Sequence, residues 1–205
     1  VNTVDGKISY PINSSDFINK WVHIAGTYDV TESKTYLYIN AELVATNSNH
    51  SGVMTQGGGT NNTNPPWTIA LGGSQHAGGS EYLNALLDEV GIWQKTLGRK
   101  DIEAIYNSQK ALDLKYDAGD YDIANELAVY YKMEDRTGTT MTDVSGNSHD
   151  GTINGATWVS GGVESTSYDN TVRGEAPSGG NALSFDGSDD YVSISNNIAG
   201  TYSAF

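Results

Sequence analysis

The chain has 205 residues, of which 37% are hydrophobic, enough for one substantial core or two smaller ones. Its 11 basic and 25 acidic side chains give a formal net charge of −14, which would repel nucleic acid and anionic membrane surfaces. The absence of cysteine excludes disulfides, thiolate nucleophiles and cysteine-bearing zinc sites. No apolar run approaches the ~18 residues of a membrane span. We therefore expect neither a nucleic-acid partner nor membrane insertion.

The first half of the chain has the pattern of an antiparallel β-sandwich. The 24 glycines favour turns over helices. Short alternating runs predict strands, and Asn40-Ala41 between two such runs predicts a tight hairpin turn. The clearest strand patterns lie at 21–28, 35–39, 67–71 and 86–93.

One short helix is predicted after these strands, because Leu97, Ile102, Ile105 and Tyr106 approximate a single apolar face of a helix. Acidic and turn-forming residues over 108–126 predict a connector. A second β-rich region then runs from 127 to 205, with strand patterns at 127–133, 157–159, 182–185 and 190–194.

The motifs of the first region resemble a known family. The segments 21–29, 36–45 and 87–93, followed by the predicted helix, resemble in order the C-terminal part of a laminin-G-like domain of the concanavalin A-like lectin/glucanase superfamily. The resemblance implies an all-β fold, an antiparallel jelly-roll sandwich of the concanavalin A-like type with one short helix. Residues 1–107 would form this C-terminal part.

The second region resembles the N-terminal part of the same family, through the segments 127–135, 142–151 and 183–192. The two parts therefore occur in reversed order, joined by the acidic connector 108–126. Either 127–205 begins the next jelly roll of a tandem array, which we favour, or it completes the same jelly roll by circular permutation.

The turn from Asp143 to Gly151 is rich in oxygen ligands of the kind that calcium prefers. The resemblance implies that this turn and an aspartate of the other region form a structural calcium site. Backbone oxygens near Ser145 and Asp150 are included in the expected ligand set, which is Asp88, Asp143, Ser145, Asn147 and Asp150. The alternative is a solvated turn rich in Asp and Asn. A second acidic turn, with Asp186, Asp189 and Asp190, resembles a family hairpin whose role is mainly architectural.

Catalysis is not expected. Asp88 and Glu89 are adjacent on a predicted strand, so their side chains would point to opposite faces, and neither has a carboxylate at the alternate positions. A retaining glycosidase needs two carboxyl groups about 5 Å apart. His23 lies on an apolar strand and is interpreted as a core residue. We therefore predict that the chain is not an enzyme.

Sugar binding requires an exposed aromatic ring beside hydrogen-bonding side chains. The candidate ligand residues are Trp67, Gln75, His76 and Tyr82, which follow the long loop 51–66. The alternative for Trp67 is a place in the core.

The sequence therefore predicts a non-catalytic, extracellular or cell-surface module that binds glycan or glycoprotein and is stabilised by calcium. The alternative is a structural repeat of a surface filament, an adhesin or a virion appendage, whose partner is another copy of itself. A third possibility is an accessory domain of a polysaccharide-degrading enzyme.

Overall fold

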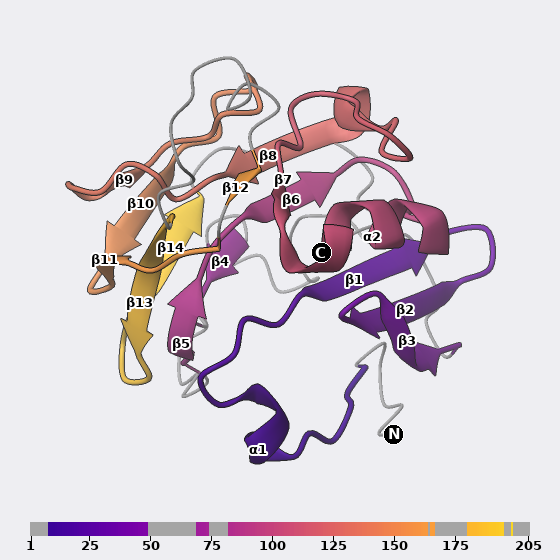
Figure 1. Cartoon of the computed structure of the whole chain (residues 1–205), viewed down its shortest axis with the longest axis horizontal. Helices are drawn as coiled ribbons and strands as arrows, with labels where there is room; N and C mark the ends of the chain where they lie inside the picture. Colours follow the sequence, from indigo (N-terminus) through magenta and orange to yellow (C-terminus); the bar gives the residue numbers. More distant parts are fainter. Residues whose placement is uncertain are drawn as a thin grey trace, which may run out of the picture. The chain divides into compact units, whose positions relative to one another are not determined.

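The computed structural model describes residues 8–48, 69–73, 82–163, 165–166, 180–194 and 198, without the side chains of 109, 165 and 166. The described residues form two compact units, each built from segments far apart in the sequence (Figure 1). Unit 1 takes its residues from 1–55 and 92–127, and unit 2 from 56–91 and 128–199. Among the described residues, no helix has both the length and the hydropathy to cross a membrane.

Unit 1 contains a three-stranded antiparallel sheet in the order β1-β2-β3 (Figure 1). The strands are β1 (Ile24–Asp29), β2 (Lys34–Ile39) and β3 (Glu42–Asn47). Unit 1 also contains the short helix α1 (Ser14–Phe17), the longer helix α2 (Arg99–Tyr106), the short strand β7 (Ala111–Leu112) and the single 3-10 turns η1 (Asn107–Gln109) and η2 (Ala124–Glu126).

The turn between β2 and β3 is the predicted two-residue hairpin. Asn40 has φ 50° and Ala41 has φ 64°, and Ile39 pairs with Glu42 across the turn. Two consecutive positive φ angles are what a type I′ turn requires, because its twist matches that of the flanking strands. The Asn40 side chain adds a further contact, since its Oδ1 accepts a hydrogen bond of 3.0 Å from the His23 N–H.

Helix α2 is fastened to β1 by the residues just before it. The Leu97 N–H donates to Thr27 Oγ1 at 3.1 Å, and the Thr96 hydroxyl donates to the carbonyl of Tyr28 at 3.1 Å. Ile102 on the helix is fully buried, as its predicted apolar face requires. The predicted helix is confirmed.

Residues 108–126 carry part of the core of unit 1. Tyr121 is fully buried, and its hydroxyl accepts a hydrogen bond from Trp93 Nε1–H and donates one to the carbonyl of Leu114. Leu114 and Ile123 are also buried. These two hydrogen bonds fix the Tyr121 side chain. The buried ring in turn anchors the acidic segment 108–126 in the core of unit 1.

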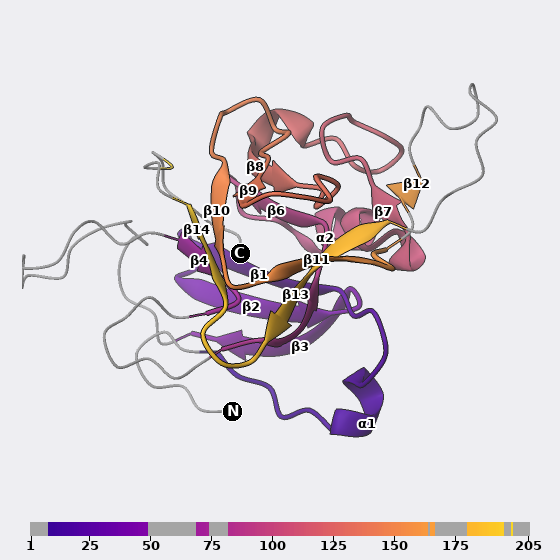
Figure 2. The same cartoon turned by 90° about the vertical axis from the view of Figure 1, so that its left-hand side faces the viewer.

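Unit 2 contains two antiparallel sheets, in the orders β4-β14-β10-β9 and β11-β13-β5 (Figures 1 and 2). The strands are β4 (Ile69–Leu71), β5 (Asn84–Leu87), β9 (Thr140–Met141), β10 (Gly151–Asn154), β11 (Thr157–Ser160), β13 (Asn181–Asp186) and β14 (Tyr191–Ile194). The short strand β12 (Ser165–Thr166) also belongs to this part of the chain.

Strands from the two sequence regions share the sheets of unit 2. Leu87 of β5 pairs with Leu183 of β13, and Ile69 of β4 pairs with Ile194 of β14. Leu183 and Ile194 are almost completely buried. The strands before residue 92 and those after residue 127 thus form continuous ladders of hydrogen bonds.

Two further strands, β6 (Val90–Trp93) and β8 (Leu127–Tyr131), run across the boundary between the units in sequence. All five residues of β8 are buried. The prediction of one strand over 86–93 is wrong, because β5 ends at Leu87 and Glu89 has φ 53°, which no strand accommodates. The predicted fold class, an antiparallel all-β sandwich with one short helix, is confirmed.

The hairpin turn yields a prediction about stability. Ala41 has a left-handed conformation that costs a non-glycine residue about 1–2 kcal/mol, so we expect Ala41→Gly to raise the free energy of unfolding by about 0.5–1 kcal/mol after its extra chain entropy. Urea unfolding of both proteins measures the difference. Ala45→Gly, in the buried part of β3, is the control and should destabilise; a loss of stability in Ala41→Gly would contradict the turn assignment.

Candidate functional site

The predicted calcium turn is organised around the carboxylate of Asp143. Its Oδ1 accepts hydrogen bonds from the N–H groups of Tyr130 and Ser145, both at 2.9 Å. Its Oδ2 accepts from the His149 N–H at 3.0 Å and lies 2.9 Å from the Ser145 hydroxyl. A carboxylate offers about four lone-pair sites, and three N–H groups of the chain use three of them. Asp143 is buried, with 8% of its surface exposed.

The other predicted ligands of this turn fasten it to β8. The Asn147 Nδ2–H donates to the carbonyl of Ala128 at 3.0 Å, and the Ser145 hydroxyl lies 3.2 Å from the same carbonyl. Asp150 Oδ1 accepts the Asp143 N–H at 2.9 Å. The structure therefore brings Asp143, Ser145, Asn147 and Asp150 together in one hydrogen-bonded turn.

Asp88, the fifth predicted ligand, has different partners. Its Oδ2 accepts the Val163 N–H at 2.7 Å, and its Oδ1 accepts the Glu89 N–H at 2.9 Å. Burial above all, and to a smaller extent the negative charge of Glu134, raise the pKa of Asp88 to about 7, against the lowering effect of the two hydrogen bonds. The neighbouring Glu89 points elsewhere, because its side chain accepts a hydrogen bond from the Tyr130 hydroxyl.

Glu134 is the acidic neighbour that sequence reasoning missed. Its Oε1 accepts the Asn181 N–H at 3.0 Å and its Oε2 accepts Asn181 Nδ2–H at 2.7 Å, while Arg136 lies 3.6 Å away. Glu134 follows directly on Met133, which has φ 53°. Met133 lies beyond the end of β8, and a left-handed residue turns the next side chain in a direction that strand periodicity does not predict.

Two glycines let the backbone approach these carboxylates. A Cβ on Gly162 would lie 2.6 Å from Asp88 Oδ2 and 2.1 Å from the carbonyl oxygen of Asn181. A Cβ on Gly180 would lie 2.9 Å from Glu134 Oε1 and 2.7 Å from the carbonyl oxygen of Val163. Carboxylate and carbonyl oxygens therefore crowd the space beside both glycines. Carboxylate and carbonyl oxygens are the types that a hard divalent cation prefers.

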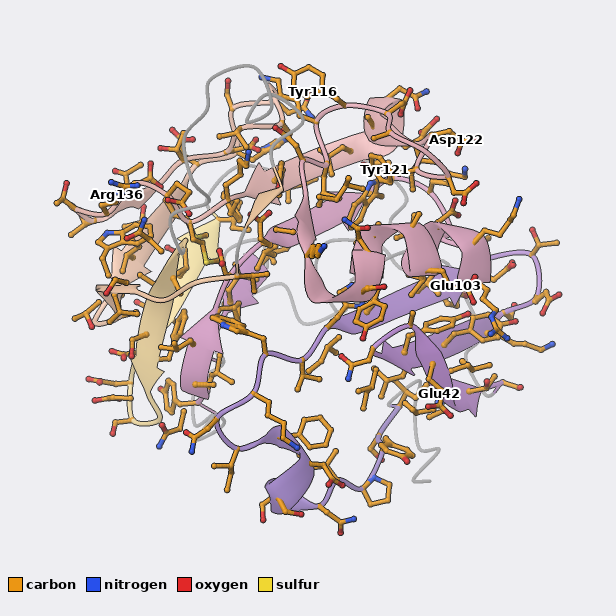
Figure 3. The ribbon with its side chains drawn as sticks, in the orientation of Figure 1. Glu42, Glu103, Tyr116, Tyr121, Asp122 and Arg136 are labelled. Carbon is orange, nitrogen blue, oxygen red and sulfur yellow. The ribbon has the colours of Figure 1, made fainter. Side chains whose placement is uncertain are left out.

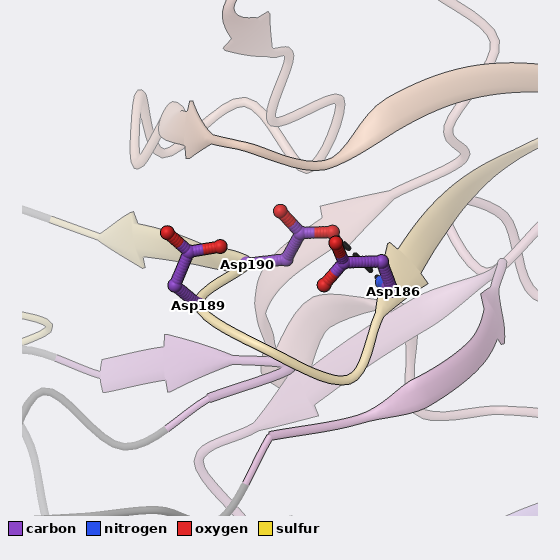
Figure 4. Close-up of side chains that lie close together, drawn as sticks. All are labelled: Asp186, Asp189 and Asp190. Carbon is purple, nitrogen blue, oxygen red and sulfur yellow. Dashed lines mark hydrogen bonds between the residues drawn. The ribbon is translucent and has the colours of Figure 1, made fainter.

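The turn between β13 and β14 gathers three further carboxylates, those of Asp186, Asp189 and Asp190 (Figure 4). One oxygen of each lies within 4.8 Å of the others. The buried Asp190 accepts the Asp186 N–H at 2.8 Å, and Asp186 accepts the Ser188 N–H at 2.8 Å. These bonds within the turn fit the architectural role that its sequence indicates.

Unit 1 carries an open groove of about 980 Å³, which we call the α2 groove. One wall is the β2–β3 turn with the start of β3, and the other is α2 with the residues that follow it. Figure 3 labels Glu42 at the start of β3 and Glu103 on α2, one from each wall. The volume lies at the upper end of ligand sites, which span about 300–1,000 Å³.

Of the predicted sugar-contact residues, Tyr82 is described and Trp67, Gln75 and His76 lie outside the described residues. Tyr82 is half-buried, forms an antiparallel bridge with Gly73, and packs its ring against that glycine.

Comparison with known proteins identifies the first half of the chain. Residues 3–103 match the family model Laminin_G_3, described as the concanavalin A-like lectin/glucanases superfamily. These residues belong to that superfamily. The membership confirms the resemblance over this segment and indicates a carbohydrate-binding or adhesion-type module, in a class of domains that is generally non-catalytic. No curated protein and no solved structure matches the chain.

The laminin-G-like segment supplies Asp88 and much of the α2 groove. His23 of this segment lies near the groove, because its ring centroid is 5.8 Å from that of Tyr106, a groove residue. The Nδ1 atom of His23 is buried and has no hydrogen-bond partner among the residues that the structure describes. Burial lowers the pKa of His23, which keeps the ring neutral.

Asp143 generates a prediction for the second region of the chain. Asparagine would place a donating NH2 group among N–H groups that now donate to the carboxylate, so these groups would lose an acceptor. We therefore expect Asp143→Asn to lower the free energy of unfolding by about 3 kcal/mol. Urea unfolding measures the loss. Asp122→Asn, an exposed aspartate, is the control and should change stability little. Equal effects of the two substitutions would show that the Asp143 bonds do not stabilise the turn.

His23 generates a pH prediction. The unfolded chain binds a proton near the ordinary pKa of 6.5, whereas the folded chain binds it only at lower pH. Stability is therefore complete above the unfolded pKa and falls as the pH drops through the folded pKa. We expect this acid-dependent loss to be smaller in His23→Phe. The free energies of unfolding of the wild type and of His23→Phe, measured between about pH 7.5 and pH 5, test this difference. Equal losses of stability with falling pH in the two proteins would contradict the prediction.

Proposed function

We propose that the chain is a non-catalytic laminin-G-like module that binds glycan or glycoprotein at the cell surface or in the extracellular space, with calcium as a structural ion. Superfamily membership of residues 3–103 supports the binding role. The carboxylates of Asp88 and Glu134, packed beside backbone carbonyls, carry the calcium proposal.

The physical case for calcium rests on an unbalanced charge. Asp88 is half-buried and its negative neighbour is Glu134, while the Arg136 guanidinium lies 3.6 Å from Glu134 and is 65% exposed. Water screens an exposed cation, so Arg136 compensates these carboxylates weakly. A divalent ion held by Asp88 and Glu134 would neutralise both and would tie the end of β5 to the residues after β8.

The sequence-based assignment remains a distinct proposal, in which Asp143, Ser145, Asn147 and Asp150 contribute to the ion. The Asp88/Glu134 assignment and the Asp143–Asp150 assignment predict that calcium binding is lost in different variants. Asp88→Asn and Glu134→Gln test the first, and Asp150→Asn tests the second, because Asp150 is exposed and its replacement leaves the Asp143 carboxylate in place.

We expect calcium to raise the melting temperature of the wild type, because an ion that binds only the folded state stabilises it. Asp88→Asn should abolish most of this rise, whereas Asp186→Asn should keep it. Thermal unfolding with calcium and with excess chelator, together with metal analysis of the purified protein, measures both. No rise and no bound metal in the wild type would contradict the proposal.

Glycan binding is tested on an array of neutral, amino and acidic oligosaccharides, with calcium present. We expect the wild type to bind a defined subset and to lose that signal when it is unfolded by heat. A folded protein that binds no glycan and no glycoprotein would overturn the binding role.

Self-association is the second candidate function, and exposed apolar side chains on unit 1 favour it. Ile12, Ile18 and Ile24 are 56%, 61% and 64% exposed, and β3 is the edge strand of its sheet among the described residues. An unpaired strand edge is a template for pairing with another chain. Light scattering with calcium and with chelator discriminates the two functions: head-to-tail assembly in both conditions supports the structural repeat, and a monomer supports the binding module.

A further inference from the structure

The α2 groove of unit 1 is polar in a way that restricts its ligand. Its lining residues include Asn40, Tyr106, Asn107, Ser108 and Lys100, whose side chains carry amides, hydroxyls and an ammonium; Asn40 Oδ1 already accepts the His23 N–H. A lipid or an apolar peptide would leave these groups without hydrogen-bond partners, at a cost of about 1–3 kcal/mol each. The lining therefore suits a ligand that carries many hydroxyls or amides.

The charges of the groove narrow the ligand further. Arg99 and Glu103 compensate one another, because Arg99 Nε–H donates to Glu103 Oε1 at 2.7 Å. The remaining charged residues of the lining are one cation, Lys100, and two carboxylates, Glu42 and Asp120. An excess of carboxylates, in a chain with a net charge of −14, disfavours an anionic ligand.

The backbone of both walls is held in a special conformation. Asn40 and Ala41 have φ of 50° and 64° on one wall, and Asn107 and Ser108 have φ of 41° and 56° on the other. Consecutive left-handed residues without glycine are strained, and such residues cluster at binding sites because they fix polar groups in place. Rigid walls lower the entropy that binding must otherwise cost.

An aromatic ring completes the site. Tyr106 belongs to the lining, and its ring is in tilted contact with that of His23, with 5.8 Å between the ring centroids. A half-buried ring beside amides and hydroxyls offers an apolar face next to directional partners, which is the combination that a sugar ring needs.

We propose that the α2 groove is the carbohydrate site of this module and that its ligand is a neutral oligosaccharide. The inference rests on the proposed function and adds the location and the ligand class. It differs from the sequence-based ligand set, which follows the loop 51–66.

The test uses the full chain and two matched double variants. Lys100→Ala/Asp120→Ala removes one cation and one carboxylate from the groove. Lys115→Ala/Asp122→Ala makes the same change in composition and net charge at exposed residues that do not line it. A third variant, Ala104→Trp, fills the groove from α2. All are measured on the glycan array and then by titration calorimetry with the strongest wild-type hit.

The expected result is a neutral oligosaccharide as the strongest hit, with binding at least about tenfold weaker in the groove variant and in Ala104→Trp, and unchanged in the control. Melting temperatures identify any variant that fails to fold. If one groove variant fails to fold, the binding affinity of the other groove variant tests the inference. Wild-type affinity in folded groove variants, equal loss in the control, or a preference for acidic oligosaccharides would each overturn this inference while leaving the binding role intact. A wild type that binds no glycan would overturn both.

Discussion

The fold of the second region depends on one buried carboxylate. Asp143 draws in the N–H groups of Tyr130, Ser145 and His149, which belong to a buried strand and to both ends of a turn. Removing a charge from water is costly unless hydrogen bonds replace the lost hydration, and here the donors of the chain do so. The turn that leads into β10, and through β10 the sheet that contains β14 and β4, starts from this point.

Sequence patterns predicted the architecture well, because alternation along strands and turn chemistry are local properties. The hairpin at Asn40-Ala41 and the helix ending at Tyr106 both follow from their own residues. The break at Glu89 was missed, since nothing in the local sequence shows that this glutamate takes a left-handed conformation to reach the Tyr130 hydroxyl. Long-range contacts decided that position.

The candidate sites were predicted less completely. Asp88 was selected, but its acidic neighbour Glu134 comes from beyond the end of β8, and only the folded chain brings the two together. The α2 groove was not predicted at all, because its walls are a hairpin turn and a helix end whose residues look like ordinary turn formers. A site that depends on backbone conformation has no characteristic residue types by which the sequence could reveal it, whereas a cluster of aspartates can be recognised directly in the sequence.

The pairing of β5 with β13 has a consequence for how the protein folds. Leu87 and Leu183 are partners, so nearly half of the chain separates two neighbouring strands. On a ribosome that adds about 5–20 residues per second, β5 waits some seconds for its partner to be made. Closing so large a loop also costs entropy before any contact compensates it, which slows folding. Biosynthesis of unit 2 is thus exposed to mispairing, and chaperones that shield strand edges would govern its yield.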